Sequence, residues 1–597
     1  RGGPFDWPAG DGDLPGDASV ASAGSPLRPG PGADAPPALD RPWCPGGHPV
    51  PWPTRAPLGT GTAGPGTTPT VAPRSTATPQ LDPRLTERAW LPLVLGAAGP
   101  ITPAATATPR PTVVLETAGP VWVPILDGPE PDSASVIVVQ NVGGVPSKAL
   151  MVEWAGPGEA GLAASAPVEV RCSGLIVPGT SWRLHRPERV GSARSAALYS
   201  LSMRTLRDLG AVPGSDEPVA DWLCRTLPGE MRGSAVAWQA FHESYLGGHQ
   251  PPGFSISHTR GAPLAVEVTT EGSQGDGPRD VPRASYHGLS HADLRVRDGK
   301  SGEYVYFAPL AHSGSGPLDA LVHAQNTGTM TATYRIVLHD RDACDRVCPC
   351  PPQTVAPGQS APTNLSACAL EGSGYPGSLT VRSDRPLAVV VDVGDRGTRS
   401  RTTARARTAA AGFTGDPAPW ADIGPVLYGP LVHYSHDWEC TVHLQNPSDD
   451  LDARARVTWF ERGGDVVGTE TGSICPGGSR SFAAPAGEEA APWYLGNVRV
   501  ESLGLDPAAA GGTGPVAPIA GVLQMTRYQL PDRTRPSGAA TYGLLAGGVS
   551  ASGAAALAVP SLTSALDDAT AEGSHTDTRL AIANLMDRPG FTDFVIY

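Results

Sequence analysis

A short phrase recurs along this chain and constrains its fold more than any other feature. It is an apolar run that ends in Asn and follows a proline flanked by apolar residues. The asparagines are Asn141, Asn326 and Asn446, with a fainter copy at Asn584. Each complete copy continues with a Pro-Gly turn (177–180, 356–359, 475–478) and a late apolar strand (262–266, 385–389, 517–521). Four landmarks in constant order indicate an internal repeat.

The repeated segments have the pattern of β-strands. Residues 454–460 alternate polar and apolar side chains, and Asn and Pro-Gly mark the places where strands stop and turn. Prolines in the first and last strands predict edge positions, because proline cannot donate to a central ladder. About seven short strands in ~100–120 residues favour an all-β chain of tandem immunoglobulin-like sandwiches. Another antiparallel sandwich or a jelly roll gives the same signals and stays open.

The landmarks divide the 597 residues into several predicted domains, as a chain too long for one core requires. We expect an extended Pro/Gly/Thr-rich arm at 1–111 with a lone strand at 90–95, then repeats at 112–270, 283–394 and 421–530 and a partial repeat at 551–597. The first repeat carries an insertion at 184–252. Leucines spaced along 193–209 predict a short surface helix there. The partial repeat would expose an unfinished core, so either the sequence is cut at Tyr597 or another chain completes the repeat.

Charge and hydropathy exclude two classes of partner. Charged residues make up 17% of the chain and the net charge is −14, which argues against nucleic-acid binding. The arginines of 395–407 are interpreted as a solvated linker. No apolar stretch is long enough to span a bilayer. We therefore expect neither a nucleic-acid partner nor a membrane span.

The nine cysteines cluster by repeat and predict local disulfides, which form in an oxidising compartment. We expect Cys440 to pair with Cys475 and Cys172 with Cys224. In the second repeat Cys344, Cys348, Cys350 and Cys368 allow three pairings. A zinc site at Cys344, Cys348 and Cys350 is the rival interpretation, but it lacks a Cys-x2-Cys knuckle. Cys44 is left over, either free or bonded to another chain.

The arm carries a distinctive segment between two Thr/Pro-rich tracts. It consists of Trp90, Leu91, Pro92, Leu93, Val94 and Leu95. An aromatic-Leu-Pro-Leu-Val-Leu segment followed by a Thr/Pro tract resembles secreted, cell-surface proteins of filamentous bacteria that carry immunoglobulin-like repeats. The resemblance implies an extracellular location and supplies no catalytic residues. The Thr/Pro tracts are candidate sites for glycans.

Catalytic and cofactor motifs fail on inspection. His242-Glu243 begins a zinc-protease pattern, but Leu246 stands where the second His is needed. Gly299-Lys300-Ser301 lacks the glycine of a phosphate loop. The pairs Asp449-Asp450 and Asp567-Asp568 lie in turn-like stretches, where solvated turns are the commoner explanation and a Ca²⁺ ligand is the alternative. We predict no enzyme, no catalytic site and no cofactor, although an enzyme hidden in the first repeat's insertion remains a lesser alternative.

These observations predict a structural subunit of a secreted assembly: a filament, sheath or surface layer built as a homo-polymer. We expect residues 90–95 to dock by strand addition onto a sandwich, favouring that of a neighbouring copy. The competing explanation is that this strand folds back on its own first repeat. The alternative function is a surface adhesin or carbohydrate-binding protein, with Trp420, Trp438, Trp459 and Trp493 stacking on sugars. Core positions in the sandwiches are the simpler explanation of these tryptophans.

Overall fold

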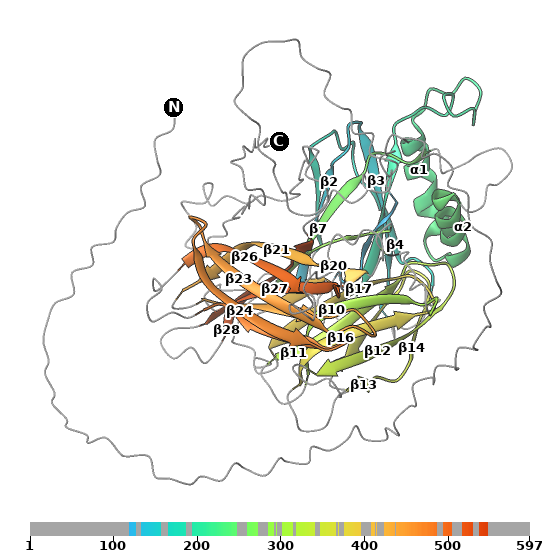
Figure 1. Cartoon of the computed structure of the whole chain (residues 1–597). Helices are drawn as coiled ribbons and strands as arrows, with labels where there is room; N and C mark the ends of the chain where they lie inside the picture. Colours follow the sequence, from blue (N-terminus) through green and yellow to red (C-terminus); the bar gives the residue numbers. More distant parts are fainter. Residues whose placement is uncertain are drawn as a thin grey trace, which may run out of the picture.

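The computed structural model of the chain describes most residues between 119 and 546 (Figure 1). The described ranges are 119–126, 133–156, 165–186, 194–247, 259–272, 284–291, 294, 301–313, 318–340, 347–365, 368, 375–395, 407–411, 413–414, 423–435, 438–485, 494–503, 516–528 and 536–546. The arm at 1–111 and the partial repeat at 551–597 lie outside them. Within these ranges the chain forms antiparallel sheets with two helices, which confirms the prediction of an all-β protein.

The first unit, residues 119–294, has two sheets and both helices. Its strands are β1 Val121–Val123, β2 Ser133–Asn141, β3 Ser147–Trp154, β4 Glu169–Cys172, β5 Ser181–Arg186, β6 Ser195–Ser202, β7 Leu264–Gly272, β8 Ala284–His287 and β9 Leu289–Ser290. One sheet has the order β4-β3-β6-β1-β9 and the other β5-β2-β7-β8. The helices α1 Val219–Met231 and α2 Ala235–Leu246 separate β6 from β7.

The second unit, residues 301–414, has the same plan without helices. Its strands are β10 Tyr304–Ser313, β11 Leu318–Asn326, β12 Ala332–Asp340, β13 Val347–Pro349, β14 Gln353–Val355, β15 Ser360–Asn364, β16 Tyr375–Ser383, β17 Leu387–Asp395, β18 Arg407–Ala411 and β19 Phe413–Thr414. The sheets run β13-β12-β16-β10-β19, with β14 also on β12, and β15-β11-β17-β18.

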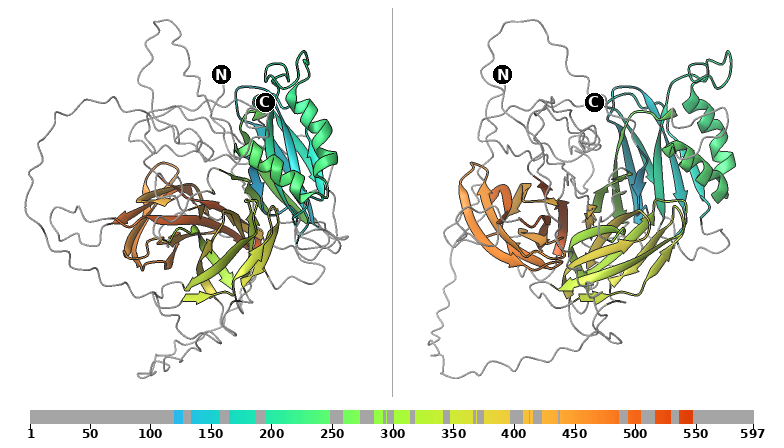
Figure 2. Two further views of the ribbon diagram at one scale, coloured as in Figure 1. Left: turned by 90° about the vertical axis from the view of Figure 1, so that its right-hand side faces the viewer. Right: turned by 45° about the vertical axis from the view of Figure 1, so that its right-hand side comes forward.

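The third unit, residues 423–546, repeats the plan again. Its strands are β20 Ile423–Gly424, β21 Val426–Tyr434, β22 Trp438–Gln445, β23 Ala453–Glu461, β24 Val466–Ile474, β25 Ser479–Ala483, β26 Tyr494–Leu503, β27 Ile519–Tyr528, β28 Pro536–Gly543 and β29 Leu545–Ala546. One sheet is β24-β23-β26-β21-β29; the other is β20-β27-β22-β25, with β28 also paired to β27. The second unit lies between the other two in both views of Figure 2.

All three units pair their strands in one order. Counting seven main strands in each, the first pairs with the sixth and the seventh with the second. An immunoglobulin constant-type domain instead places the first strand beside the second and the seventh beside the sixth. The antiparallel sandwich expected from the sequence is therefore present with a different order from that type.

Alternation along the strands builds the cores. In β23, Ala453, Ala455, Val457 and Trp459 are buried against the opposing sheet, whereas the intervening side chains are more exposed. In β3 and β6 of the first unit nearly every position is buried. Both faces of that sheet are covered because α1 and α2 pack on its outer side (Figure 1).

Two expectations need correction. Residues 195–202, within the predicted surface helix at 193–209, form β6, whose leucines lie in two cores on opposite faces of a sheet. The helices begin later, at Val219 and Ala235. Neither the first nor the last strands are edges, because β1, β10 and β21 each pair on both sides, and so do β7, β17 and β27. Pro309 and Pro430 instead coincide with register shifts, where the ladder is interrupted and proline's missing donor costs nothing.

Strand pairs also follow the predicted ends of the repeats. Residues 284–290, 407–414 and 536–546 add two short strands to each unit, one to each of its sheets. The predicted repeats end before these strands, at 270, 394 and 530, because the Gly-, Arg- and Pro-rich composition that follows is typical of linkers. The domain boundaries as a set stay a prediction.

Candidate assembly interface

The asparagine of each repeat closes a clasp inside its own unit. The Asn326 side chain donates to the Met330 and Val355 carbonyls at 2.7 and 3.0 Å and accepts from the Gly328 amide at 2.9 Å. Asn141 and Asn446 make the equivalent three bonds, with Val145, Ile176 and Gly143 and with Leu451, Ile474 and Ser448. Each asparagine thus uses both of its side-chain N–H donors and one of the two lone pairs of its carbonyl oxygen.

The backbone completes the clasp by tying the Pro-Gly turn to the same asparagine. The Asn326 amide donates to the Gln359 carbonyl, and the Gly358 amide donates back to the Asn326 carbonyl at 2.9 Å. The bonds at Asn141 and Asn446 match, with Gly179 and Gly477 as donors. These glycines have φ of 81°, 77° and 70°, a left-handed conformation that favours glycine. The clasp therefore fixes the preceding glutamine and the turn at one end of each unit.

That glutamine reaches the preceding unit. Gln325 Nε2 donates to the Ala196 carbonyl of β6 at 3.1 Å, and Gln445 Nε2 donates to the Leu379 carbonyl of β16 at 3.3 Å. The register makes the two acceptors equivalent: each pairs with the residue just before the first-strand proline, Val123 in one case and Ala308 in the other. Both glutamines are fully buried. Two successive junctions therefore use one donor and one acceptor position.

The turn glycine makes the second repeated contact. A Cβ added to Gly358 would lie 2.2 Å from the Trp154 ring, and one added to Gly477 would lie 3.1 Å from the His339 ring. Trp154 and His339 occupy the same position, because they pair with Ser195 and Ser378, each one residue before the glutamine's acceptor. Only a glycine allows so close an approach at the first junction.

An alanine and an aromatic ring make the third contact. Ala388 and Ala520 lie opposite Gln325 and Gln445 in the late strands and are fully buried. Ala388 belongs to the buried cluster of Trp122 and Trp154 in the first unit. Ala520 packs with Phe307 and Val305 of the second unit. Trp122 and Phe307 each lie two residues before their first-strand proline, so the apolar part of the junction is repeated too.

Polar contacts differ between the junctions. At the first, the Ser195 hydroxyl donates to the Gly358 carbonyl and the Gln239 amide of α2 donates to the Thr329 carbonyl. At the second, Arg382 Nη2 lies 3.3 Å from an Asp449 carboxylate oxygen. Within the second unit, next to this junction, the His339 ring bonds the Thr380 hydroxyl. Burial, with a contribution from the Arg382 guanidinium, lowers the pKa of His339 to about 4. His339 is therefore neutral at physiological pH.

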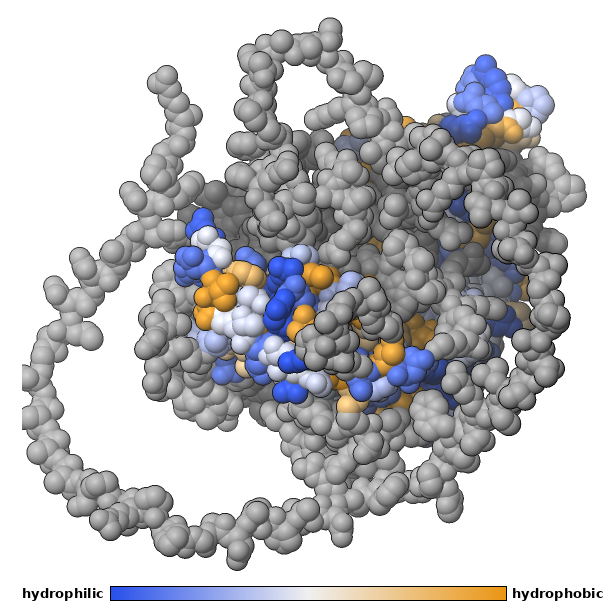
Figure 3. Space-filling model, viewed as in Figure 1, coloured by the Kyte–Doolittle hydropathy of each residue, from blue (hydrophilic) through white to orange (hydrophobic). Residues whose placement is uncertain are grey.

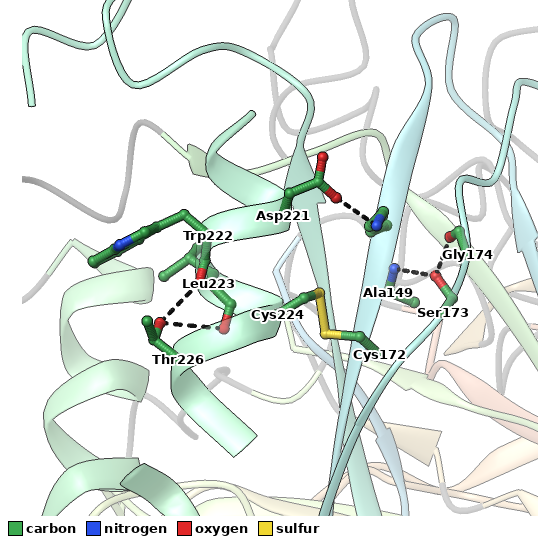
Figure 4. Close-up of a disulfide and its surroundings, with 10 residues drawn as sticks. Ala149, Cys172, Ser173, Gly174, Asp221, Trp222, Leu223, Cys224 and Thr226 are labelled. Carbon is green, nitrogen blue, oxygen red and sulfur yellow. Dashed lines mark hydrogen bonds and ion pairs between the residues drawn. A yellow bond between two sulfur atoms is a disulfide. The ribbon is translucent and has the colours of Figure 1, made fainter. Parts of the chain in front are cut away.

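The predicted disulfide between Cys172 and Cys224 is present, with an S–S distance of 2.06 Å (Figure 4). It joins β4 to α1 and holds the helical layer against the sheet, next to the Lys148–Asp221 ion pair. Of the three pairings open in the second repeat, the structure shows Cys350 bonded to Cys368 beside the core. A zinc site that uses Cys350 is excluded by this bond.

The predicted disulfide between Cys440 and Cys475 is wrong. Cys440 is a buried free thiol that donates to the His433 carbonyl, and burial raises its pKa to about 12. The turn that follows Cys475 pairs with Asn446, six residues along the strand from Cys440. Six strand residues span roughly 20 Å, far beyond disulfide reach.

Cys475 is nevertheless disulfide-bonded. Cys172, Cys224, Cys350 and Cys368 are already paired and Cys440 is free. Cys475 therefore pairs with none of these five cysteines.

The other residues singled out in the sequence have structural positions. His242 lies on the buried face of α2 in an aromatic cluster, where its Nδ1 is 3.0 Å from the Tyr199 hydroxyl and its ring stacks on Trp238. Burial raises the pKa of Tyr199 far above its usual range. Trp459 is core, and Trp438 stacks on His433. In the described part of the chain no group of three metal-ligating side chains occurs, and no helix has the length and apolar character to cross a membrane.

Several predicted residues fall outside the described ranges. These are the assembly strand (Trp90, Leu91, Pro92, Leu93, Val94 and Leu95), Cys44, Cys344, Trp420 and Trp493. The junction residues were visible in the sequence as landmarks, yet their role was missed. The signal was the identity of Gln140, Gln325 and Gln445, because ending a strand requires the asparagine but not the glutamine before it.

Comparisons with known proteins do not assign the chain to a family. No family model matches it, and no curated protein matches it. One solved structure, titled "Crystal Structure of Thermotoga maritima 1070", aligns with 19% of this chain and 95% of its own, at 19% identity and a TM-score of 0.16. A likeness at that score carries no functional argument.

Proposed function

We propose that the chain is a structural subunit of an extracellular assembly, a filament, sheath or surface layer, built from tandem β-sandwich repeats. The observation that carries the proposal is the repeated junction. The second and third units dock on their predecessors through one glutamine, one turn glycine and one alanine each. A junction that recurs along a chain can also recur between chains, and a head-to-tail contact propagates unless rotation closes it into a ring.

Two disulfide bonds of the described chain support an extracellular location. The disulfides at Cys172–Cys224 and Cys350–Cys368 are of the kind that persists outside the cytosol. Each unit is stabilised by its own core and clasp, which suits a protein that must stay folded away from chaperones. The function is mechanical and non-enzymatic on this proposal, and its partner is a copy of the same chain.

The arm strand at 90–95 belongs to the same proposal. Strand addition needs an unpaired sheet edge, and β24 has one neighbour, β23, among the described strands. Exposed and buried side chains alternate little along β24, so backbone hydrogen bonds would contribute most to the contact between β24 and the added strand. Deleting residues 88–96 should weaken polymers if the arm exchanges strands between copies. Normal polymers from that variant would refute strand addition by residues 90–95 but not the proposal that the chain is a structural subunit of an assembly.

Negative-stain electron microscopy of the purified native material tests the function directly. The proposal predicts regular polymers or sheets with a constant repeat. A monodisperse monomer at every concentration accessible to the protein would refute it. Specific retention of such a monomer on a glycan array would favour the adhesin alternative instead.

A further inference from the structure

Each junction has a donor half and an acceptor half. The donor half carries the glutamine, the turn glycine and the late-strand alanine. The acceptor half carries the strand carbonyl and two ring positions, one on the first strand and one on the third. Within the described chain the second unit uses both halves, donating to the first unit and accepting from the third. The first unit's donor half and the third unit's acceptor half have no such counterpart among the described residues.

The first unit retains the complete donor half. Gln140 lies opposite Ala265 in the late strand, as Gln325 lies opposite Ala388. Gln140 Nε2 donates to its own turn, at the Gly179 carbonyl, as Gln325 does at Gly358, but it has no bond to a second unit among the described residues. In the same part of the chain the Oε1 atoms of Gln140, Gln325 and Gln445 all lack a hydrogen-bond partner. Gln140 and Ala265 are half-buried, whereas their counterparts in both other units are fully buried. Leu175 and Val177, which precede this turn, are 52% and 41% exposed.

The third unit retains the acceptor half. Val498 pairs with Gly429, the residue before the first-strand proline, so its carbonyl matches those of Ala196 and Leu379. Tyr428 and Phe460 stand at the two ring positions and are half-buried. Val466, paired with Phe460, is 59% exposed, and apolar patches adjoin hydrophilic ones over the third unit in Figure 3. Arg499, next to Val498, brings a guanidinium where the second unit has Thr380.

We propose that the donor half of the first unit docks on the acceptor half of the third unit in a second copy of this chain. Gln140 would donate to the Val498 carbonyl, and the Arg499 guanidinium would donate to Gln140 Oε1. Gly179 would approach Phe460, and Ala265 would pack on Tyr428. The inference rests on the proposed function and names the contact through which the assembly grows.

Residues 551–597 of the same chain are the competing occupant of the third unit. Their faint copy of the repeat has Ala583 where the glutamine stands in the others. It therefore lacks the amide that makes the repeated bond at both observed junctions. The donor half of a second copy fits the acceptor half better, because it includes the glutamine side chain.

The test uses the full chain with a photoreactive amino acid at Val177. Equal amounts of isotopically light and heavy protein are mixed, assembled, irradiated and analysed by peptide mass spectrometry. The proposal predicts mixed light–heavy cross-links from residue 177 to β21, β23, β24 or β26. Cross-links confined to one chain, cross-links between chains to any other segment, or no cross-links would overturn it.

A charge substitution gives an independent readout. Val177→Asp should raise the concentration needed for assembly by about tenfold or more, because it places a charge two residues from Gly179, inside the proposed contact. The matched control is Val236→Asp, a 76% exposed position on α2, which should assemble as the wild type does. Unchanged assembly of Val177→Asp would refute this interface and leave the proposed function intact. Failure of the wild type itself to assemble would refute both.

Discussion

Replacing Gly358 by alanine tests how tightly the first and second units fit. The added Cβ would lie 2.2, 2.5 and 2.6 Å from Cε2, Nε1 and Cζ2 of Trp154, closer than van der Waals contact permits. Trp154 is fully buried and is packed against Trp122 and Trp238, so its side chain cannot adopt another rotamer without displacing these rings. The two units must therefore move apart at the turn, and the bond from Gln325 to Ala196 must stretch with them.

The third unit offers a matched variant. Gly477 has nearly the same left-handed φ, 70° against 77°, so alanine costs about 1–2 kcal/mol of backbone strain at either site. At Gly477 the nearest ring atom is 3.1 Å from the added Cβ, a contact that a small shift of the half-buried His339 relieves. Overpacking at Gly358 adds about 1–3 kcal/mol. We expect Gly358→Ala to destabilise by about 2–5 kcal/mol in total.

Calorimetry with hydrogen exchange measures the difference, because a chain of several units does not unfold in one step. Gly358→Ala should lower the midpoint temperature of the thermal transition in which the first or the second unit unfolds. It should also speed amide hydrogen exchange in β3 and β6. Gly477→Ala should have the smaller effect, with changes centred on β12 and β16. Equal destabilisation by both variants would refute the argument that the Trp154 contact sets the fit.

Three further predictions follow from the clasp, the disulfide and His339. Asn326→Ala should destabilise the second unit by about 2–5 kcal/mol, because it leaves two buried carbonyls and an amide unpaired; a loss under 1 kcal/mol in denaturant titration would contradict this. Cys224→Ser opens a bridge of sequence separation 52 and should cost about 4 kcal/mol, read as an earlier melting of the first unit that a reductant reproduces in the wild type. His339 stays neutral when folded while the unfolded chain takes up a proton below pH 6.5, so stability should fall by up to about 3 kcal/mol as pH drops from 6.5 towards 4; His339→Gln should abolish that part of the slope, and an unchanged slope would refute it.

Sequence periodicity predicts the strands with one exposed face but not which strands pair with one another. The alternation around Val457 and the stop at Asn446, whose side chain bonds Ser448 and Leu451, have local causes, so the residues alone predict them. The pairing of β2 with β7 and of β1 with β6 depends on contacts more than 70 residues apart and leaves no local signature. The buried leucines of β6 imitated a helix face because both sides of that strand are covered.

Cysteine pairing shows the same limit. Cys172 and Cys224 were identified from their proximity to one repeat and its insertion. Cys440 and Cys475 also share a repeat, but Cys440 lies near the start of β22 and Cys475 lies next to the residue that follows its end. Their spacing in the sequence does not reveal this separation. The glutamines recur in the sequence as plainly as the cysteines, but the carbonyls to which they donate lie in another unit. Only the folded chain shows these hydrogen bonds.

A three-dimensional reconstruction of the native polymer by electron cryomicroscopy tests the central claim most directly. The account predicts that each subunit meets the next through the repeated junction, with Gln140 of one copy against the Val498 strand of its neighbour. The two inter-subunit halves should superimpose on the junctions between the units within a chain. A polymer whose subunits meet through other surfaces, with Gln140 facing solvent, would contradict it.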